Sequence, residues 1–213
     1  LASSAASDVY KRQIYVLIRL YLVTSCVIPT YSMSPTLTAG DYIIASLRIP
    51  GRREIKKDGA RPEHYIVQRK EGTREVRKGD VTVFNFPYSK GEERMIMVFD
   101  LYFCKRCVGT PGDTYRWMWD GVTRSVYLPR QGEVVRIDSS NFRHYNRCIE
   151  YETGLMPQLV KESVMHADTV MHSYRFKCNY YFMRGDNDAD SYDSRFWGIL
   201  PEDFILGVGL FTW

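Results

Sequence analysis

Apolar positions follow two different patterns along the chain. Residues 14–28, "IYVLIRLYLVTSCVI", form one nearly continuous apolar run, which predicts a helix. After Pro29, short runs rich in β-branched and aromatic residues are separated by Gly, Pro, Asp and Asn, a pattern typical of strands. The predicted strands span residues 42–47, 81–86, 95–108, 122–128, 134–137, 174–183 and 205–211. We therefore expect a mainly β fold with an N-terminal apolar helix and few other helices.

The apolar run at residues 14–28 is interpreted as a membrane anchor. As a helix it reaches about 22 Å, less than the roughly 30 Å of a hydrocarbon core, and Arg19 interrupts it. We expect Arg19 to extend toward the headgroups, and Lys11 and Arg12 predict that the N-terminal side faces the cytoplasm. The alternative is a buried amphipathic helix of a soluble protein. Because the chain begins with Leu1 rather than Met, a fragment or a cloning remnant is expected at this end.

Composition narrows the class of protein. The 45% hydrophobic content supports a packed core. The net charge of +4 suits an anionic membrane surface but is too small to indicate nucleic-acid binding. The basic stretch at residues 48–80 is interpreted as a solvated loop or exposed hairpin, with contact to anionic lipid as a lesser possibility. The segment "SSNFRHYNRCIEYETG" predicts a short helix in an inserted subdomain.

The five cysteines do not indicate a metal or redox site. Cys104 and Cys107 form a CxxC pair, but zinc would require a second pair or histidines at ligand spacing. We interpret both as small apolar residues on a buried strand. No metal or other cofactor is predicted.

The stretch "PTYSMSPTLTAGD", residues 29–41, contains a candidate nucleophile, Ser32. A serine hydroxyl needs a base, and none of the four histidines lies in a context typical of a Ser-His-Asp triad. A lysine can serve only when neutral, which at its ordinary pKa is about one molecule in 2,500 at pH 7. Burial lowers a lysine pKa by up to about 3–5 units.

Lys105 is the candidate base because it lies in the most apolar stretch after the N-terminal run, "MIMVFDLYFCKRCVGTPGD". Strand alternation places it on the same face as Phe103 and Cys107, with Arg106 opposite. The alternative is an edge-strand lysine whose amine reaches solvent.

A third stretch, "RGDNDADSYDSRFWGILPED" at residues 184–203, has acidic spacing that resembles a calcium loop. Ser191 and Trp197 occupy the positions where such a loop requires Gly and Glu, so calcium is rejected. Asp193 and Arg195 are instead predicted to form a charge-assisted pair, and Ser191 offers a hydroxyl to a neighbouring group.

Four segments in order resemble the conserved boxes of the type I signal peptidases, membrane-anchored Ser/Lys endopeptidases. They are "PTYSMSPTLTAGD", "KGDVTVFNFP" at 78–87, "FCKRCVGTPGD" at 103–113 and "GDNDADSYDSRFWG" at 185–198. The resemblance implies Ser32 as the nucleophile, Lys105 as the general base and Ser191 as the group that orients the lysine. It implies an oxyanion hole formed by the Ser32 N–H and the Thr30 hydroxyl. It also implies structural supports for the site, namely Asp186, Asp193 and Arg195.

Three residues depart from the family's pattern. Tyr31 is bulky where the family commonly has a small residue before the nucleophile, and Asp188 and Asp190 stand where Arg and Asn are frequent. The two aspartates make the last box more acidic, and none of the three changes removes a catalytic group.

The resemblance implies a membrane-bound serine endopeptidase that removes N-terminal signal peptides from exported preproteins. Its substrates would be extended and carry small residues before the cut, and its catalytic domain would lie on the extracytoplasmic side of a single-pass anchor in the cell membrane. We predict four parts: a tail and anchor (1–28), a catalytic core in two pieces (29–113 and 176–213) and an inserted subdomain (114–175). The alternatives are a self-cleaving Ser/Lys repressor and a non-catalytic β module that binds partner chains.

Overall fold

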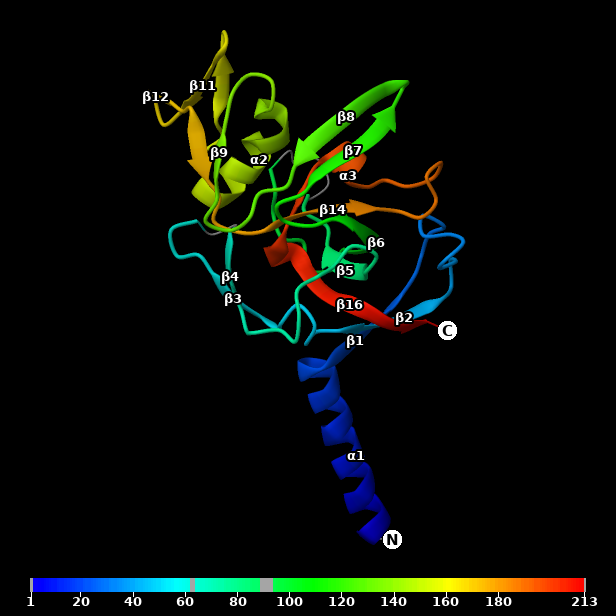
Figure 1. The fold of residues 1–213 in the computed structure, drawn as a ribbon. Coiled ribbons are helices and arrows are strands. Elements are labelled where there is room, and N and C mark those ends of the chain that lie inside the picture. Colours follow the sequence, from blue (N-terminus) through cyan, green and yellow to red (C-terminus); the bar gives the residue numbers. More distant parts are fainter. Residues whose placement is uncertain (1, 62–63, 89–93, 213) are drawn as a thin grey trace.

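One antiparallel sheet of seven strands organises the chain (Figure 1). The computed structural model describes residues 2–61, 64–88 and 94–212. In spatial order the strands are β1 (Val23–Val27), β2 (Tyr42–Ser46), β16 (Ile205–Thr212), β5 (Val81–Asn85), β6 (Tyr102–Gly109), β14 (Tyr180–Arg184) and β15 (Leu200–Pro201). Strands from the C-terminal part of the chain lie between and beside strands from the N-terminal part, so neither part forms the sheet alone.

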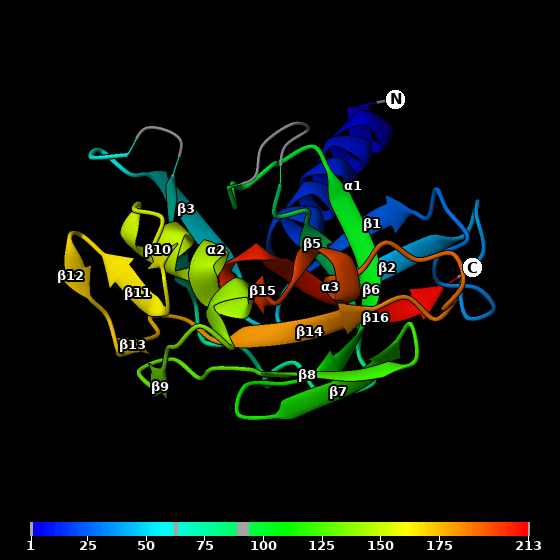
Figure 2. The ribbon, with the colours of Figure 1, turned by 90° about the horizontal axis from the view of Figure 1, so that it is seen from above.

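Smaller elements surround this sheet. The hairpins and short sheets are β3–β4 (Arg53–Lys57, Tyr65–Arg69), β7–β8 (Thr114–Trp119, Val122–Tyr127), β9–β13 (Val134–Arg136, Ser173–Arg175) and β10–β11–β12 (Gln158–Val160, Ser163–His166, Thr169–Val170). The helices are α1 (Ala2–Tyr21), α2 (Phe142–Thr153), the short α3 (Ser194–Trp197) and a 3-10 turn (Glu202–Phe204). In both views the β7–β8 hairpin lies beside β14 (Figures 1 and 2).

The predicted helix over residues 14–28 is wrong in its second half. Helix α1 ends at Tyr21, and the β-branched stretch after it forms β1, which pairs with β2 along its whole length. The Arg19 guanidinium donates to the Ser25 hydroxyl and so ties the end of the helix to this strand. Tertiary pairing here overrides the apolar run.

Helix α1 projects from the β-rich body (Figure 1). In the described part of the chain, no helix combines the length and the apolar character needed to cross a bilayer.

Most of the predicted strands are confirmed to within about two residues at each end, and two are not. The predicted strand 95–108 begins only at Tyr102. Met95 and Met97 are apolar and buried, as in a strand, but they belong to the loop before it. The predicted strand 174–183 is two strands, interrupted where Phe176 enters the core. The basic stretch does form a hairpin, β3–β4, and the predicted short helix is α2.

Candidate active site

Two buried side chains hold the Ser32 loop in place. Met33 and Leu37 are each 1% exposed and pack in a small cluster that includes Ile28 and Ile43. The Leu37 N–H donates to the Met33 carbonyl at 3.0 Å and closes a turn that contains the cis Ser34–Pro35 bond. Each such side chain contributes about 1.5–3 kcal/mol when fully buried. The core therefore determines where the backbone presents Ser32.

Lys105 lies beside Ser32 and is almost completely buried. It sits on β6 opposite Thr82 of β5, and its exposed fraction is 4%. Its Nζ is hydrogen-bonded to Oγ of Ser32. Because β6 lies between β5 and β14, Lys105 is not the solvent-exposed edge lysine of the alternative interpretation.

Burial lowers the pKa of Lys105 below its ordinary value. Removing the ammonium from water disfavours its charged form, and the negative fields of Asp193 and Asp190 oppose this only in part. In the described part of the chain, no carboxylate forms an ion pair with Nζ. The site therefore stabilises the neutral form of this amine relative to that of an exposed lysine.

The Thr30 hydroxyl lies next to the Ser32 hydroxyl. Its Oγ1 lies 3.2 Å from Oγ of Ser32, within hydrogen-bond distance. Among the described residues, the backbone N–H of Ser32 has no acceptor. A hydroxyl and a free N–H thus flank the Ser32 oxygen.

Ser191 reaches the same region through Gly185. A Cβ on Gly185 would stand 2.2 Å from Oγ of Ser191 and 2.3 Å from the Ser32 carbonyl oxygen, so both groups press against this glycine. Ser191 is 8% exposed, and its Oγ is hydrogen-bonded to no residue that the structure describes, Lys105 included. Its role in orienting the lysine stays a prediction. Gly185 was not singled out from the sequence, although it is the first residue of the last box.

Asp193 and Arg195 form the predicted pair. The Asp193 carboxylate is fully buried and accepts from Nε of Arg195 at 2.8 Å and from Nη2 at 2.9 Å. It also accepts from the Gly185 N–H at 3.1 Å, which fixes the segment beside Ser32. Burial disfavours the ionised form of this carboxylate. The hydrogen bonds to it have the larger opposite effect and hold the pKa of Asp193 below its usual value.

Asp186 links three segments through Arg106. The guanidinium donates to the Asp186 carboxylate in a bidentate pair at 2.8 and 2.6 Å, to the Gly79 carbonyl at 2.7 Å and to the Thr36 hydroxyl at 3.3 Å. Arg106 therefore joins the lysine strand to the nucleophile loop and to the last box. The sequence placed Arg106 opposite Lys105 without assigning this contact.

Asn187 is a further contact that sequence reasoning missed. Its backbone N–H donates to the Ser32 carbonyl at 3.1 Å, and its side-chain amide donates to the Tyr31 carbonyl at 3.2 Å. Both bonds join the last box to the nucleophile loop. Its place in the Gly-Asp-Asn triplet beside Asp186 is the signal that would have found it.

Two of the aspartates in the last box bind arginines. Asp186 pairs with Arg106, whereas Asp188 contacts Arg184, so the two carboxylates face different partners. Nowhere in residues 2–61, 64–88 and 94–212 do three His, Cys, Asp or Glu side chains gather as metal ligands. Cys104 and Cys107 are free thiols on β6, with Cys107 fully buried, as interpreted from the sequence.

A cleft of about 580 Å³ opens over the Ser32–Lys105 pair. Residues 28–33 and 101–105 line it, together with Asp190 and Tyr192. Tyr31, the bulky departure from the family's pattern, is 59% exposed and so does not fill the interior of the cleft. An extended chain can reach the Ser32 oxygen from this side.

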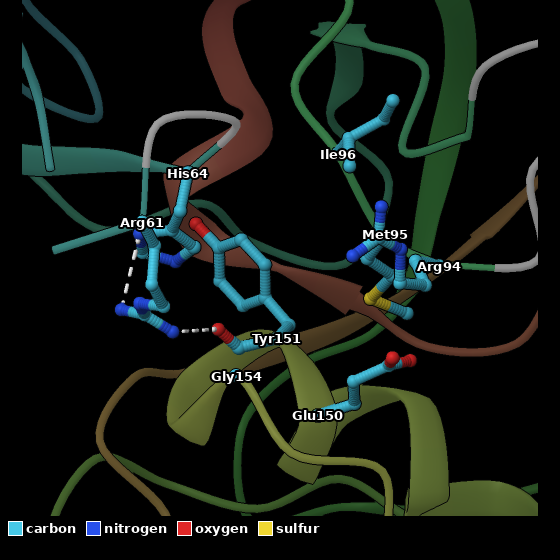
Figure 3. Close-up of a pocket in the computed structure, with 8 residues that line it drawn as sticks. All are labelled: Arg61, His64, Arg94, Met95, Ile96, Glu150, Tyr151 and Gly154. Atoms are coloured by element: carbon cyan, nitrogen blue, oxygen red, sulfur yellow. Dashed lines mark hydrogen bonds between the residues drawn. The ribbon is translucent and has the colours of Figure 1, made fainter.

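A second pocket, of about 330 Å³, shares no lining residue with the cleft (Figure 3). Figure 3 shows Arg61 between His64 and the Tyr151 carbonyl, and Arg61 lies 3.2 Å from Nδ1 of His64. This histidine also lies 3.5 Å from the Asp58 carboxylate.

Known proteins resemble the chain along most of its length. Signal peptidase I of Pseudomonas aeruginosa is 27% identical over 224 residues, which cover 94% of this chain and 68% of the relative. Signal peptidase I of Pseudomonas fluorescens is 26% identical, with the same coverage of both chains. Signal peptidase I of Aquifex aeolicus is 27% identical over 89% of this chain and 75% of the relative.

The model of one protein family matches the chain almost from end to end. Its description is "Signal peptidase, peptidase S26", and the match covers residues 9–213. That span includes every box on which the resemblance rests. The chain therefore belongs to the signal peptidase family, peptidase S26.

Proposed function

We propose that this protein is a membrane-bound serine endopeptidase that removes N-terminal signal peptides from exported preproteins. The observation that carries the proposal is the contact between Nζ of Lys105 and Oγ of Ser32, made by a lysine that is 4% exposed. A buried, neutral amine in contact with a serine hydroxyl is a base and a nucleophile already in position. Membership of the peptidase family supports the same reading.

The reaction follows from these positions. The neutral amine of Lys105 takes the Ser32 proton while Oγ attacks the scissile carbonyl. The Ser32 N–H and the Thr30 hydroxyl donate to the oxyanion. The lysine then gives its proton to the leaving amine, and an acyl-enzyme on Ser32 remains. A water molecule, deprotonated by Lys105, releases the acyl group, and Ser191 would keep the amine oriented throughout.

The substrate would bind as an extended strand in the cleft, with small side chains before the cut. We place the enzyme at the cell membrane, with its catalytic domain on the extracytoplasmic side and no nucleic-acid partner. Sharing a bilayer with the preprotein would raise the effective substrate concentration. The divided catalytic core (29–113 and 176–213) and the inserted subdomain (114–175) belong to the same proposal.

Cleavage of a preprotein in detergent tests this function. We expect wild type to release the mature protein, Ser32→Ala to be inactive, and Ser34→Ala to keep its activity. Ser34 is a matched control because it lies on the same loop, and among the described residues its hydroxyl has no hydrogen bond. Equal results for wild type and Ser32→Ala would contradict the proposal and favour a non-catalytic β module.

Thr30→Val is expected to lower turnover about 100-fold or more while the fold persists. Loss of one oxyanion donor typically costs about 3 kcal/mol in the transition state. The side chain is exposed, and among the described residues its hydroxyl is hydrogen-bonded to Ser32 alone, so little stability depends on it. Steady-state kinetics of Thr30→Val and of Thr30→Ser, which keeps the hydroxyl, make the measurement. Normal turnover in the valine variant would remove Thr30 from the oxyanion hole.

A further inference from the structure

A pocket away from the catalytic cleft is lined by an unusual excess of positive charge. It has a volume of about 380 Å³ and is lined by residues of the β7–β8 hairpin, α2 and α3. Arg124 comes from the hairpin, Arg143 and Arg147 come from α2, and His144 lies beside them. No residue that lines this pocket is an Asp or a Glu.

The three arginines have no carboxylate at ion-pair distance among the described residues, although Arg147 lies 5.2 Å from the centre of the Tyr88 ring and its charge acts on Glu150. Among the described residues, Arg124, Arg143 and Arg147 form no ion pair. Arg143 and Arg147 are four residues apart on α2, a spacing at which like charges destabilise a helix. Arg195 also lines the pocket, but its charge is already paired with Asp193. A cleft lined by one sign of charge attracts ions of the opposite sign.

The nearest acidic group on α2 does not fill this pocket. Glu150 lines the neighbouring pocket, where Figure 3 shows it directed toward Arg94. Burial raises the pKa of Glu150, although Arg94 and Arg147 act in the opposite direction. The arginine pocket therefore has no carboxylate of its own among the described residues.

Two buried donors in the same pocket also lack acceptors. Trp117 and Trp197 are 8% and 2% exposed, and both line the pocket. Within the described part of the chain, neither indole N–H has a hydrogen-bond partner. An unsatisfied buried donor costs about 1–3 kcal/mol, so each indole N–H calls for an acceptor that the described residues do not supply.

We infer that this arginine pocket binds a phosphate-class oxyanion. Such an ion carries several acceptor oxygens, which can receive the indole N–H groups and the guanidinium groups together. Guanidinium groups match its geometry in bidentate pairs. The ion can be free or can be the phosphomonoester of a lipid headgroup, since the recognised chemistry is the same.

Titration calorimetry tests the inference. The full chain is titrated with inorganic phosphate and with pyrophosphate, both at constant ionic strength. We expect saturable binding that is at least about tenfold weaker when both Arg143→Gln and Arg147→Gln are present. The matched control carries Arg116→Gln and Arg136→Gln, which remove the same charge from exposed positions outside the pocket. In ¹⁵N spectra, we expect the indole N–H signals of Trp117 and Trp197 to shift on binding. The indole signals also report whether the variants remain folded.

Vesicles distinguish the two sources of the anion. Pocket-dependent binding to vesicles that contain phosphatidic acid, but not to phosphatidylcholine alone, would assign the site to a lipid headgroup. Pocket-dependent binding of the free ions alone would assign it to a soluble anion. Absence of binding in every arm, or equal affinity in the pocket variant and the surface control, would overturn the inference. The measurements can be made in Ser32→Ala, so they do not depend on peptidase activity.

Discussion

Replacing Lys105 with methionine is expected to abolish turnover and to make the protein more stable at neutral pH. The substitution removes the proposed base, a loss of about 10²- to 10⁴-fold for general base catalysis alone. It also replaces a buried amine with an apolar side chain of similar length, so the cost of burying that polar group disappears. The site would thus maintain its reactivity at the expense of stability.

The pH dependence separates the two effects. The folded pKa of Lys105 is lowered, so between that pKa and the unfolded value of about 10.4 the unfolded chain binds the extra proton. Wild-type stability therefore rises with pH across this window, and the contribution of Lys105 to that rise should be missing in Lys105→Met. Turnover of the wild type should rise as pH increases through the folded pKa, because only the neutral amine is a base.

Preprotein cleavage and thermal unfolding at neutral pH and near pH 10 provide the measurements. Lys56→Met is the control, since Lys56 is exposed on β3. It should leave turnover unchanged and shift the free energy of unfolding by no more than about 0.5 kcal/mol. A Lys105→Met protein that still cleaves substrate would refute the assigned base.

Gly185→Ala is expected to lower turnover by about 100-fold or more and to destabilise the fold by about 1–3 kcal/mol. The new methyl group would overlap the Ser191 hydroxyl at 2.2 Å and the Ser32 carbonyl at 2.3 Å. The carbonyl is backbone and cannot rotate away, so the nucleophile loop has to move. A displacement of about 1 Å is enough to cost 10²-fold in rate.

The control for this substitution is Gly59→Ala, because a Cβ on Gly59 would meet nothing within 4 Å. Cleavage kinetics and denaturant unfolding of both variants make the comparison. Wild-type kinetics in Gly185→Ala would mean that the loop around Ser32 tolerates displacement, against the close packing described above.

Much of the site was predictable because its chemistry is local. A serine in a turn before Met-Ser-Pro and a lysine inside an apolar strand are visible as patterns, and Asp193 and Arg195 are two residues apart. The contacts of Arg106 and Asn187 were not predictable in the same way. Apart from the Arg106–Gly79 contact, they join segments about 70 to 160 residues apart. Half of the partner atoms are backbone carbonyls, which leave no trace in composition or spacing.

The extent of the secondary structure also depended on context. The run at residues 14–28 is mostly apolar, yet its second half forms a strand that pairs with β2. Met95 and Met97 are as apolar as strand residues and are nevertheless buried from a loop. Hydrophobicity indicates that a residue will be buried, but it does not indicate which other residues will pack against it. Those residues are determined by the tertiary fold.

The sequence by itself determined the class of fold, the two candidate catalytic side chains and the family, because each depends on short-range pattern or on ordered motifs. Only the tertiary structure decided that the amine and the hydroxyl meet and that Gly185 must lack a side chain. It also decided that arginines of α2 and the β7–β8 hairpin share a pocket with two indoles whose N–H groups have no acceptor among the described residues. The physical reason is that the pKa of an amine, the crowding of a glycine and the attraction for an anion all depend on what surrounds a group in space. Those surroundings come from strands that are distant in the chain and adjacent only in the folded sheet.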